Sequence, residues 1–145
     1  MTGEVFRILL VEDNEADVYL FRKALQNVGL EFELIVMEDG GKAIQFVRGE
    51  GEHAGRAIPA LAVIDLSLPK NDGVQVLEAI RADECFAGMP VVVTSSSATP
   101  PARLDEKHLQ VARYVTKPPD LEEFLQIGAA LKETLLQGHA RRASR

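Results

Sequence analysis

Three carboxylates and one lysine follow short apolar runs of this sequence. Glu12 and Asp13 come directly after the first apolar run of the chain, Asp65 comes after the third, and Lys117 comes after the fifth. If the runs are parallel strands, their carboxyl ends meet at one sheet edge, and carboxylates about 4 Å apart would repel by roughly 4 kcal/mol. Oxygen ligands without a neighbouring His or Cys favour Mg²⁺ or Mn²⁺ over zinc. The residues therefore predict a divalent cation site.

A simpler interpretation has to be weighed against this site. Glu12 and Asp13 taken alone are equally well explained as solvated loop or cap residues. The lone Asp65, the hydroxyl residues Ser95 and Ser96 after the fourth run, and a lysine after the fifth make coincidence a poor explanation for the whole set.

The elements that must position these residues alternate along the chain. Short apolar runs predict strands at residues 6–11, 32–37, 60–64, 90–93 and 114–116, and four of these runs are nearly unbroken, as strands buried on both faces should be. Apolar residues spaced by three and four predict helices between them, at residues 15–28, 41–48, 74–83, 102–110 and 121–136. Asn14 and Asp120 are suited to begin helices, and Gly29 to end the first one. The pattern is that of an α/β, doubly wound parallel sheet, which binds ligands at the carboxyl ends of its strands.

Composition excludes several classes of function. The 145 residues suit one domain, and no apolar run of about 18 residues is present to cross a membrane. The first residues lack the pattern of a signal peptide, so a cytoplasmic protein is expected. A net charge of −6 argues against direct binding of nucleic acid. The single cysteine, Cys85, has no partner for a disulfide or a zinc site.

The motifs resemble the receiver domains of two-component response regulators over nearly the whole chain. The most specific pieces are VEDN at residues 11–14, IDLSLPKNDG at 64–73, the strand at 90–95 and YVTKP at 114–118. Ser95 lies 22 residues before Lys117 and Tyr114 lies three before it, as in that family. The long, charged loop at 48–57 is similar to that of stand-alone regulators that work with phytochrome-type sensor kinases.

This resemblance implies a flavodoxin-like receiver fold with strand order 2-1-3-4-5 and a chemistry for the site. Asp65 would accept a phosphoryl group from a sensor histidine kinase. Mg²⁺, or Mn²⁺ in its place, would be held by the side chains of Glu12, Asp13 and Asp65 and by the backbone carbonyl of Ser67. Lys117, the Ser95 hydroxyl and the Ser96 backbone N–H would bind the phosphoryl oxygens.

The resemblance also implies how the signal leaves the molecule. Ser95 and Tyr114 would be the switch residues. Family receivers carry a cis peptide bond at the position of Lys117 and Pro118, so the resemblance implies one here. Residues 1–137 would form one receiver domain, and 138–145 a flexible basic tail without an output domain. We expect a signalling domain that catalyses only its own phosphotransfer and dephosphorylation and acts on a protein partner without contacting nucleic acid or membrane. We also expect it to form a homodimer through its last two helices or its C-terminal segment.

Two other classes of protein remain as alternatives. A metal-dependent phosphatase or phosphotransferase of the haloacid-dehalogenase type also uses an Asp after a strand, a Ser or Thr, a Lys and Mg²⁺. That family has a second acid two residues beyond the nucleophile, where this chain has Ser67. A flavin- or nucleotide-binding domain would have a first loop rich in Gly, Ser and Thr, whereas residues 12–15 here are EDNE.

Overall fold

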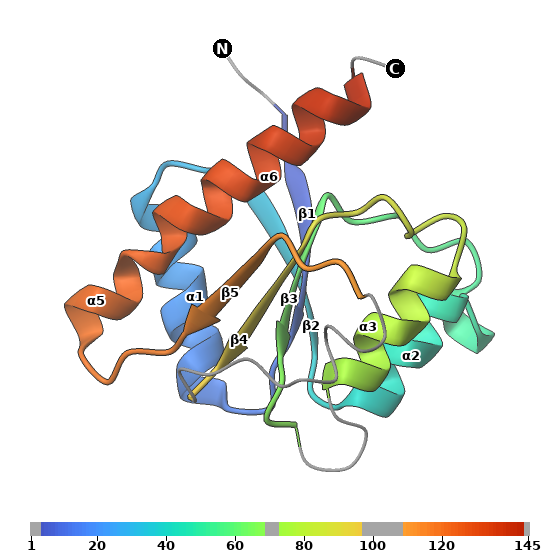
Figure 1. Cartoon of the computed structure of the whole chain (residues 1–145), viewed down its shortest axis with the longest axis horizontal. Helices are drawn as coiled ribbons and strands as arrows, with labels where there is room; N and C mark the ends of the chain where they lie inside the picture. The colour runs from blue at the N-terminus through green and yellow to red at the C-terminus, as the bar shows by residue number, and fades with distance from the viewer. Residues whose placement is uncertain (1–3, 69–72, 97–108, 144–145) are drawn as a thin grey trace.

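The computed structural model describes residues 4–68, 73–96 and 109–143, and these form one parallel sheet covered by helices on both faces (Figure 1). The five strands lie in the order β2-β1-β3-β4-β5, which confirms the predicted topology. Their bounds are β1 (Phe6–Val11), β2 (Phe32–Met37), β3 (Leu61–Asp65), β4 (Val91–Ser95) and β5 (Arg113–Thr116). Each differs from its prediction by at most two residues at either end.

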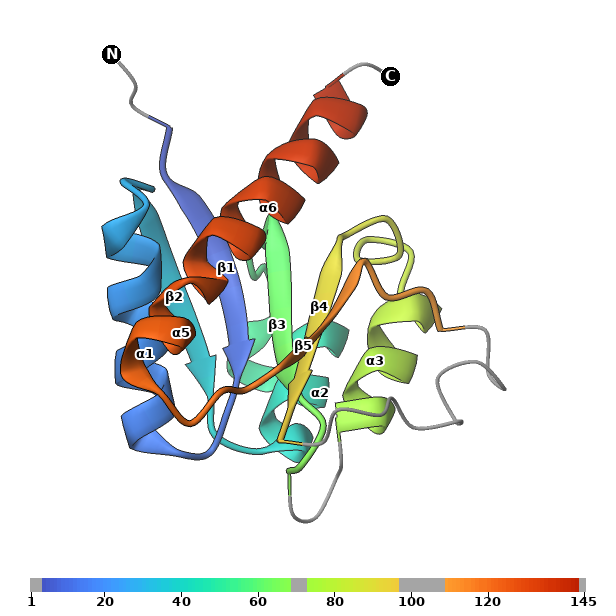
Figure 2. The same ribbon diagram turned by 60° about the vertical axis from the view of Figure 1, so that its left-hand side comes forward.

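The described helices divide between the two faces of the sheet (Figures 1 and 2). One face carries α1 (Glu15–Asn27), α5 (Leu121–Leu125) and α6 (Ile127–Ala143), and the other carries α2 (Gly40–Arg48) and α3 (Gly73–Ala82). The part of the chain that the structure describes contains no helix with the length and apolar character needed to span a bilayer.

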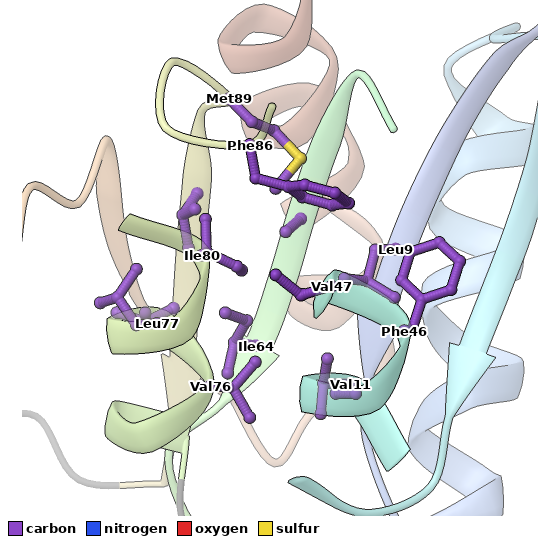
Figure 3. Close-up of a cluster of buried hydrophobic side chains, with 14 of the residues drawn as sticks. Leu9, Val11, Phe46, Val47, Ile64, Val76, Leu77, Ile80, Phe86 and Met89 are labelled. Carbon is purple, nitrogen blue, oxygen red and sulfur yellow. The ribbon is translucent and has the colours of Figure 1, made fainter. Parts of the chain in front are cut away.

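Successive strand residues point to opposite faces, so the sheet separates two apolar cores. In β1, Ile8 and Leu10 pack toward α1, α5 and α6, whereas Leu9 and Val11 pack toward α2 and α3. Figure 3 shows the second core, where side chains of α2 and α3 meet those of the sheet. Its labelled members are Leu9, Val11, Phe46, Val47, Ile64, Val76, Leu77, Ile80, Phe86 and Met89. The central strands β1, β3 and β4 are apolar without alternation because both of their faces are buried, whereas the edge strands β2 and β5 are half-buried.

The helix ends follow the local sequence. The Asn14 side chain accepts a hydrogen bond from the backbone N–H of Asp17 at 3.1 Å and so begins α1. Asp120 likewise begins α5, and Gly29 follows α1 with a positive φ of 71°. All three predicted helix boundaries are confirmed.

The charged loop at residues 48–57 is held against the domain by Arg56. Its guanidinium donates to the Val47 carbonyl at 2.6 Å, lies 3.6 Å from the Asp83 carboxylate, and stacks 5.3 Å from the centre of the Phe86 ring. The loop contains a short 3-10 helix, η1 (Gly51–His53). The insertion is therefore an ordered part of the domain, packed over the ends of α2 and α3.

One prediction about the helices needs revision, and another is mostly untested. The last helix, expected to end at Leu136, is interrupted at Gln126 and then continues to Ala143, so most of the segment expected to be a flexible tail is helical. The helix expected at 102–110 falls largely outside the described residues. Its last two positions, Leu109 and Gln110, are not helical.

Candidate functional site

The carboxylates predicted to gather at one sheet edge do so. Val11 of β1 is in register with Ile64 of β3, so Glu12 and Asp65 follow on neighbouring strands. Figure 2 shows the carboxyl ends of the strands meeting at the lower edge of the sheet. Glu12, Asp13 and Asp65 each offer an oxygen atom, and these atoms lie within 4.8 Å of one another. Three oxygen ligands at this separation suit one hard divalent cation.

Glu12 is the most deeply buried of the three acids. It is 1% exposed, and Asp65 is 4% exposed, whereas Asp13 lies at the surface. The pKa of Glu12 is raised to about 7, mainly because the side chain is buried. The hydrogen bond from Lys117 lowers this pKa, and the nearby charge of Asp65 raises it. The site therefore carries an excess of negative charge that a cation would relieve.

Lys117 extends from the end of β5 into this cluster. Its ammonium Nζ lies 2.7 Å from Glu12 Oε1, 2.9 Å from Asp17 Oδ2 and 3.3 Å from Asp65 Oδ2. Burial alone would lower the pKa of the lysine, but hydrogen bonds to Asp17 and Glu12 outweigh burial and the pKa is raised. The ammonium is therefore charged at neutral pH and directly beside Asp65.

Asp17 is a member of this arrangement that the sequence analysis missed. It lies in the first turn of α1, and its side chain is 22% exposed. A signal was available, because Asn14 as the first residue of a helix places residues 15–17 over the same sheet edge as Glu12. A helix-turn carboxylate is nevertheless so common that its spacing alone singles out no role.

The remaining predicted site residues lie around the cluster. The Ser67 backbone N–H donates to Asp65 Oδ1 at 2.8 Å, which fixes the turn after β3. Ser95 is 7% exposed at the end of β4, and its carbonyl accepts the Lys117 backbone N–H at 2.8 Å. Ser96 is exposed directly after it, and Tyr114 is half-buried against the core formed with α2 and α3.

The expected cis bond between Lys117 and Pro118 is absent. No cis peptide bond occurs among the described residues, so this bond is trans. Lys117 is aimed at the cluster instead by the backbone pairing of β5 with β4 and by its three carboxylate partners.

A groove of about 530 Å³ opens beside the carboxylates, between α1 and β2. Its lining residues include Glu12 and Asp13 together with Tyr19, Arg22 and Val36. The Asp13 side of the cluster is thus accessible to a partner molecule.

This arrangement suits phosphoryl transfer to a carboxylate. The Asp65 carboxylate could supply an oxygen nucleophile, the Lys117 ammonium lies 3.3 Å from it, and three carboxylates could bind a cation. Phosphoryl transfer depends mainly on such positioning and neutralisation of charge.

Comparison with known proteins decides between the families that use such a site. The model of the response regulator receiver domain matches residues 8–128. The chain belongs to this receiver domain family. The haloacid-dehalogenase alternative is not supported, since the match is to receivers over most of the chain, and a receiver is a signalling domain.

The receiver is similar to several regulators over most of their length. It is 33% identical to the response regulator Rcp1 of Synechocystis, over 90% of this chain and 88% of that protein. The crystal structure of the phosphorylated cyanobacterial phytochrome response regulator RcpA is 38% identical, with a TM-score of 0.82 over 92% of this chain and 95% of that one. The Mn²⁺-bound form of Rcp1 is 33% identical, with a TM-score of 0.78 over 88% and 91% of the two chains.

Proposed function

We propose that this receiver accepts a phosphoryl group on Asp65 from a phosphohistidine of a sensor histidine kinase. The observation that carries the proposal is the placement of the Asp65 carboxylate. It belongs to the cluster of three oxygen ligands and also lies 3.3 Å from the Lys117 ammonium. A carboxylate that lies between a cation site and a fixed ammonium lets the negative charge of an incoming phosphoryl group be neutralised, which is what this transfer requires.

The transfer balances without a further reactant. An Asp65 carboxylate oxygen forms a bond to phosphorus as the bond between phosphorus and the imidazole nitrogen breaks, and the imidazole leaves and takes a proton from solvent. The product is an acyl phosphate with about two negative charges. The domain catalyses only this step and the later hydrolysis of the acyl phosphate.

The residues present fit a magnesium ion. Glu12, Asp13, Asp65 and the Ser67 backbone carbonyl would hold it, with Mn²⁺ as a substitute, because the donors are all oxygen. When bound, the ion supplies positive charge toward the phosphoryl oxygens. The Mn²⁺-bound form of Rcp1 supports this assignment.

The remaining roles concern the switch. Lys117, the Ser95 hydroxyl and the Ser96 backbone N–H bind the phosphoryl oxygens. The added charge draws Ser95 inward, and Tyr114 moves against the space that it leaves. This shifts the population between two arrangements of the surface near β5.

The partners follow from the relatives. The kinase is of the phytochrome type, as the similarity to RcpA supports, and the ordered loop at 48–57 is in keeping with that group. The receiver spans residues 1–137, acts in the cytoplasm without nucleic acid or membrane, and passes its signal to a protein partner. It forms a homodimer through its last two predicted helices or its C-terminal segment; of these helices, the one predicted at 121–136 corresponds to α5 and most of α6, and most of the one predicted at 102–110 lies outside the described residues.

Incubation with acetyl phosphate and Mg²⁺ tests the proposal. Intact-protein mass spectrometry should show one phosphoryl group per chain, which disappears without Mg²⁺ or in Asp65→Asn. Asp120→Asn is the matched control, because Asn begins a helix as well as Asp does and the variant should be modified like the wild type. Modification that persists in Asp65→Asn would contradict the proposal, and multiple turnover of a phosphate ester would favour a phosphatase.

A further inference from the structure

The carboxylates around Lys117 differ in one respect, since two belong to the cation cluster and one does not. Glu12 and Asp65 are in the cluster of oxygen ligands, whereas Asp17 lies outside it. We propose that Asp17 is a positioning residue, which holds the Lys117 ammonium beside the phosphoacceptor when a divalent cation occupies the site. This inference rests on the proposed function and deepens it.

The cation and the lysine compete for the same two carboxylates, those of Glu12 and Asp65. Lys117 Nζ is 2.7 Å from Glu12 Oε1 and 3.3 Å from Asp65 Oδ2. A cation bound to those two carboxylates draws on the same negative charge and repels the ammonium. The hydrogen bond to Asp17 Oδ2, at 2.9 Å, is the one that the cation leaves intact.

Asp17 and Lys117 are each held by their own backbone. The Asp17 N–H is bonded to the Asn14 side chain in the first turn of α1, and α1 is anchored by the buried Phe21. The Lys117 N–H is bonded to the Ser95 carbonyl. The two groups therefore meet without depending on the carboxylates of the cation site.

The lysine needs such a partner because it is shielded from water. Its side chain is 12% exposed, so an ammonium that loses Glu12 and Asp65 would be left largely without compensation unless Asp17 remained. Asp17 thereby lowers the free energy of the cation-bound state. It also keeps the ammonium close to Asp65, ready to pair with the incoming phosphoryl group.

A double-mutant cycle on Mn²⁺ binding, followed by the electron paramagnetic resonance of free Mn²⁺, tests this role. Asp17→Asn should weaken Mn²⁺ binding by about tenfold in the wild-type background, and by less than about twofold in Lys117→Met. Glu15→Gln, which removes another first-turn acid of α1, is the matched control and should change affinity by less than about twofold. An equal loss in both backgrounds would show that Asp17 acts only as a charge on the cation, and would overturn the inference.

A second measurement does not require the Lys117→Met variant to fold. The ¹⁵N-detected ammonium signal of Lys117 should persist when Mg²⁺ is added to the wild type and should be lost by exchange with water in Asp17→Asn. An unchanged signal in Asp17→Asn would overturn the inference. Wild-type protein that binds no Mn²⁺ would instead overturn the proposed function, and this inference with it.

Discussion

Cation binding should strengthen steeply between pH 5.5 and 7.5, because Glu12 has to lose its proton to act as a ligand. Burial raises the pKa of Glu12 to about 7. With that pKa the carboxylate is about 3% ionised at pH 5.5 and about 76% at pH 7.5, so the apparent affinity for Mn²⁺ should rise about 25-fold over this range and level off above about pH 8. Calorimetric titrations at pH 5.5, 6.5, 7.5 and 8.5 measure the rise.

The same pKa predicts the opposite trend for the stability of the metal-free protein. Folded Glu12 keeps its proton up to about pH 7, whereas a glutamate in the unfolded chain loses it near 4.5. The folded state binds more protons between these values, so the free energy of unfolding should fall as pH rises, by at most about 3 kcal/mol.

Glu12→Gln is the control for both trends. The variant should bind Mn²⁺ more weakly, and the dependence on pH due to this residue should vanish from both binding and stability. Wild-type Mn²⁺ affinity that is flat between pH 5.5 and 7.5 would refute the reasoning, since it would mean that Glu12 is already ionised throughout.

Three further predictions concern the packing that holds the site. In urea titrations, Gly128→Ala should lower the free energy of unfolding by about 2 kcal/mol or more, because its Cβ would lie 2.2 Å from the Ala24 carbonyl oxygen. Gly88 has open space around it, so the control Gly88→Ala should change the free energy of unfolding by less than about 0.5 kcal/mol. Equal effects of the two substitutions would contradict the close approach of α1 and α6. Leu131→Ala should cost about 2 to 5 kcal/mol by the same assay, and a loss below about 1 kcal/mol would mean that its fully buried position is wrong. Arg56→Met should lower the free energy of unfolding by about 1 to 2 kcal/mol and speed hydrogen exchange in residues 48–57, because the guanidinium contacts Val47 and Asp83. Unchanged exchange in this loop would show that the guanidinium does not hold it.

Much of the fold could be predicted because its signals are local. The strands β1 and β2 have the predicted bounds, since short runs rich in apolar residues and bounded by polar ones favour strands wherever they lie. Asn14 and Asp120 begin helices through contacts within three residues of themselves. Glu12, Asp13 and Asp65 could be placed together because parallel strands bring their carboxyl ends to one edge.

The helix after Asp120 shows where local signals end. Its apolar spacing runs out at Leu136, yet α6 continues to Ala143, and a distant contact accompanies the extension. The His139 ring packs edge-on against Phe6 at 5.3 Å and lies 3.4 Å from the Glu4 carboxylate, at the other end of the chain. The residue pattern within the helix does not predict these contacts with Phe6 and Glu4, because they come from a distant part of the chain.

The sequence by itself determined the order of strands and helices, the sheet edge that bears chemistry, and the residues able to bind a cation there, because these depend on residue type and on spacing along the chain. Only the tertiary structure decided that Glu12 is buried enough to titrate near neutral pH, that the bond before Pro118 is trans, and that Lys117 has a third partner in Asp17. Burial and ion pairing are properties of atoms that meet across 52 to 105 positions of sequence in this site, so they exist only once the sheet has formed.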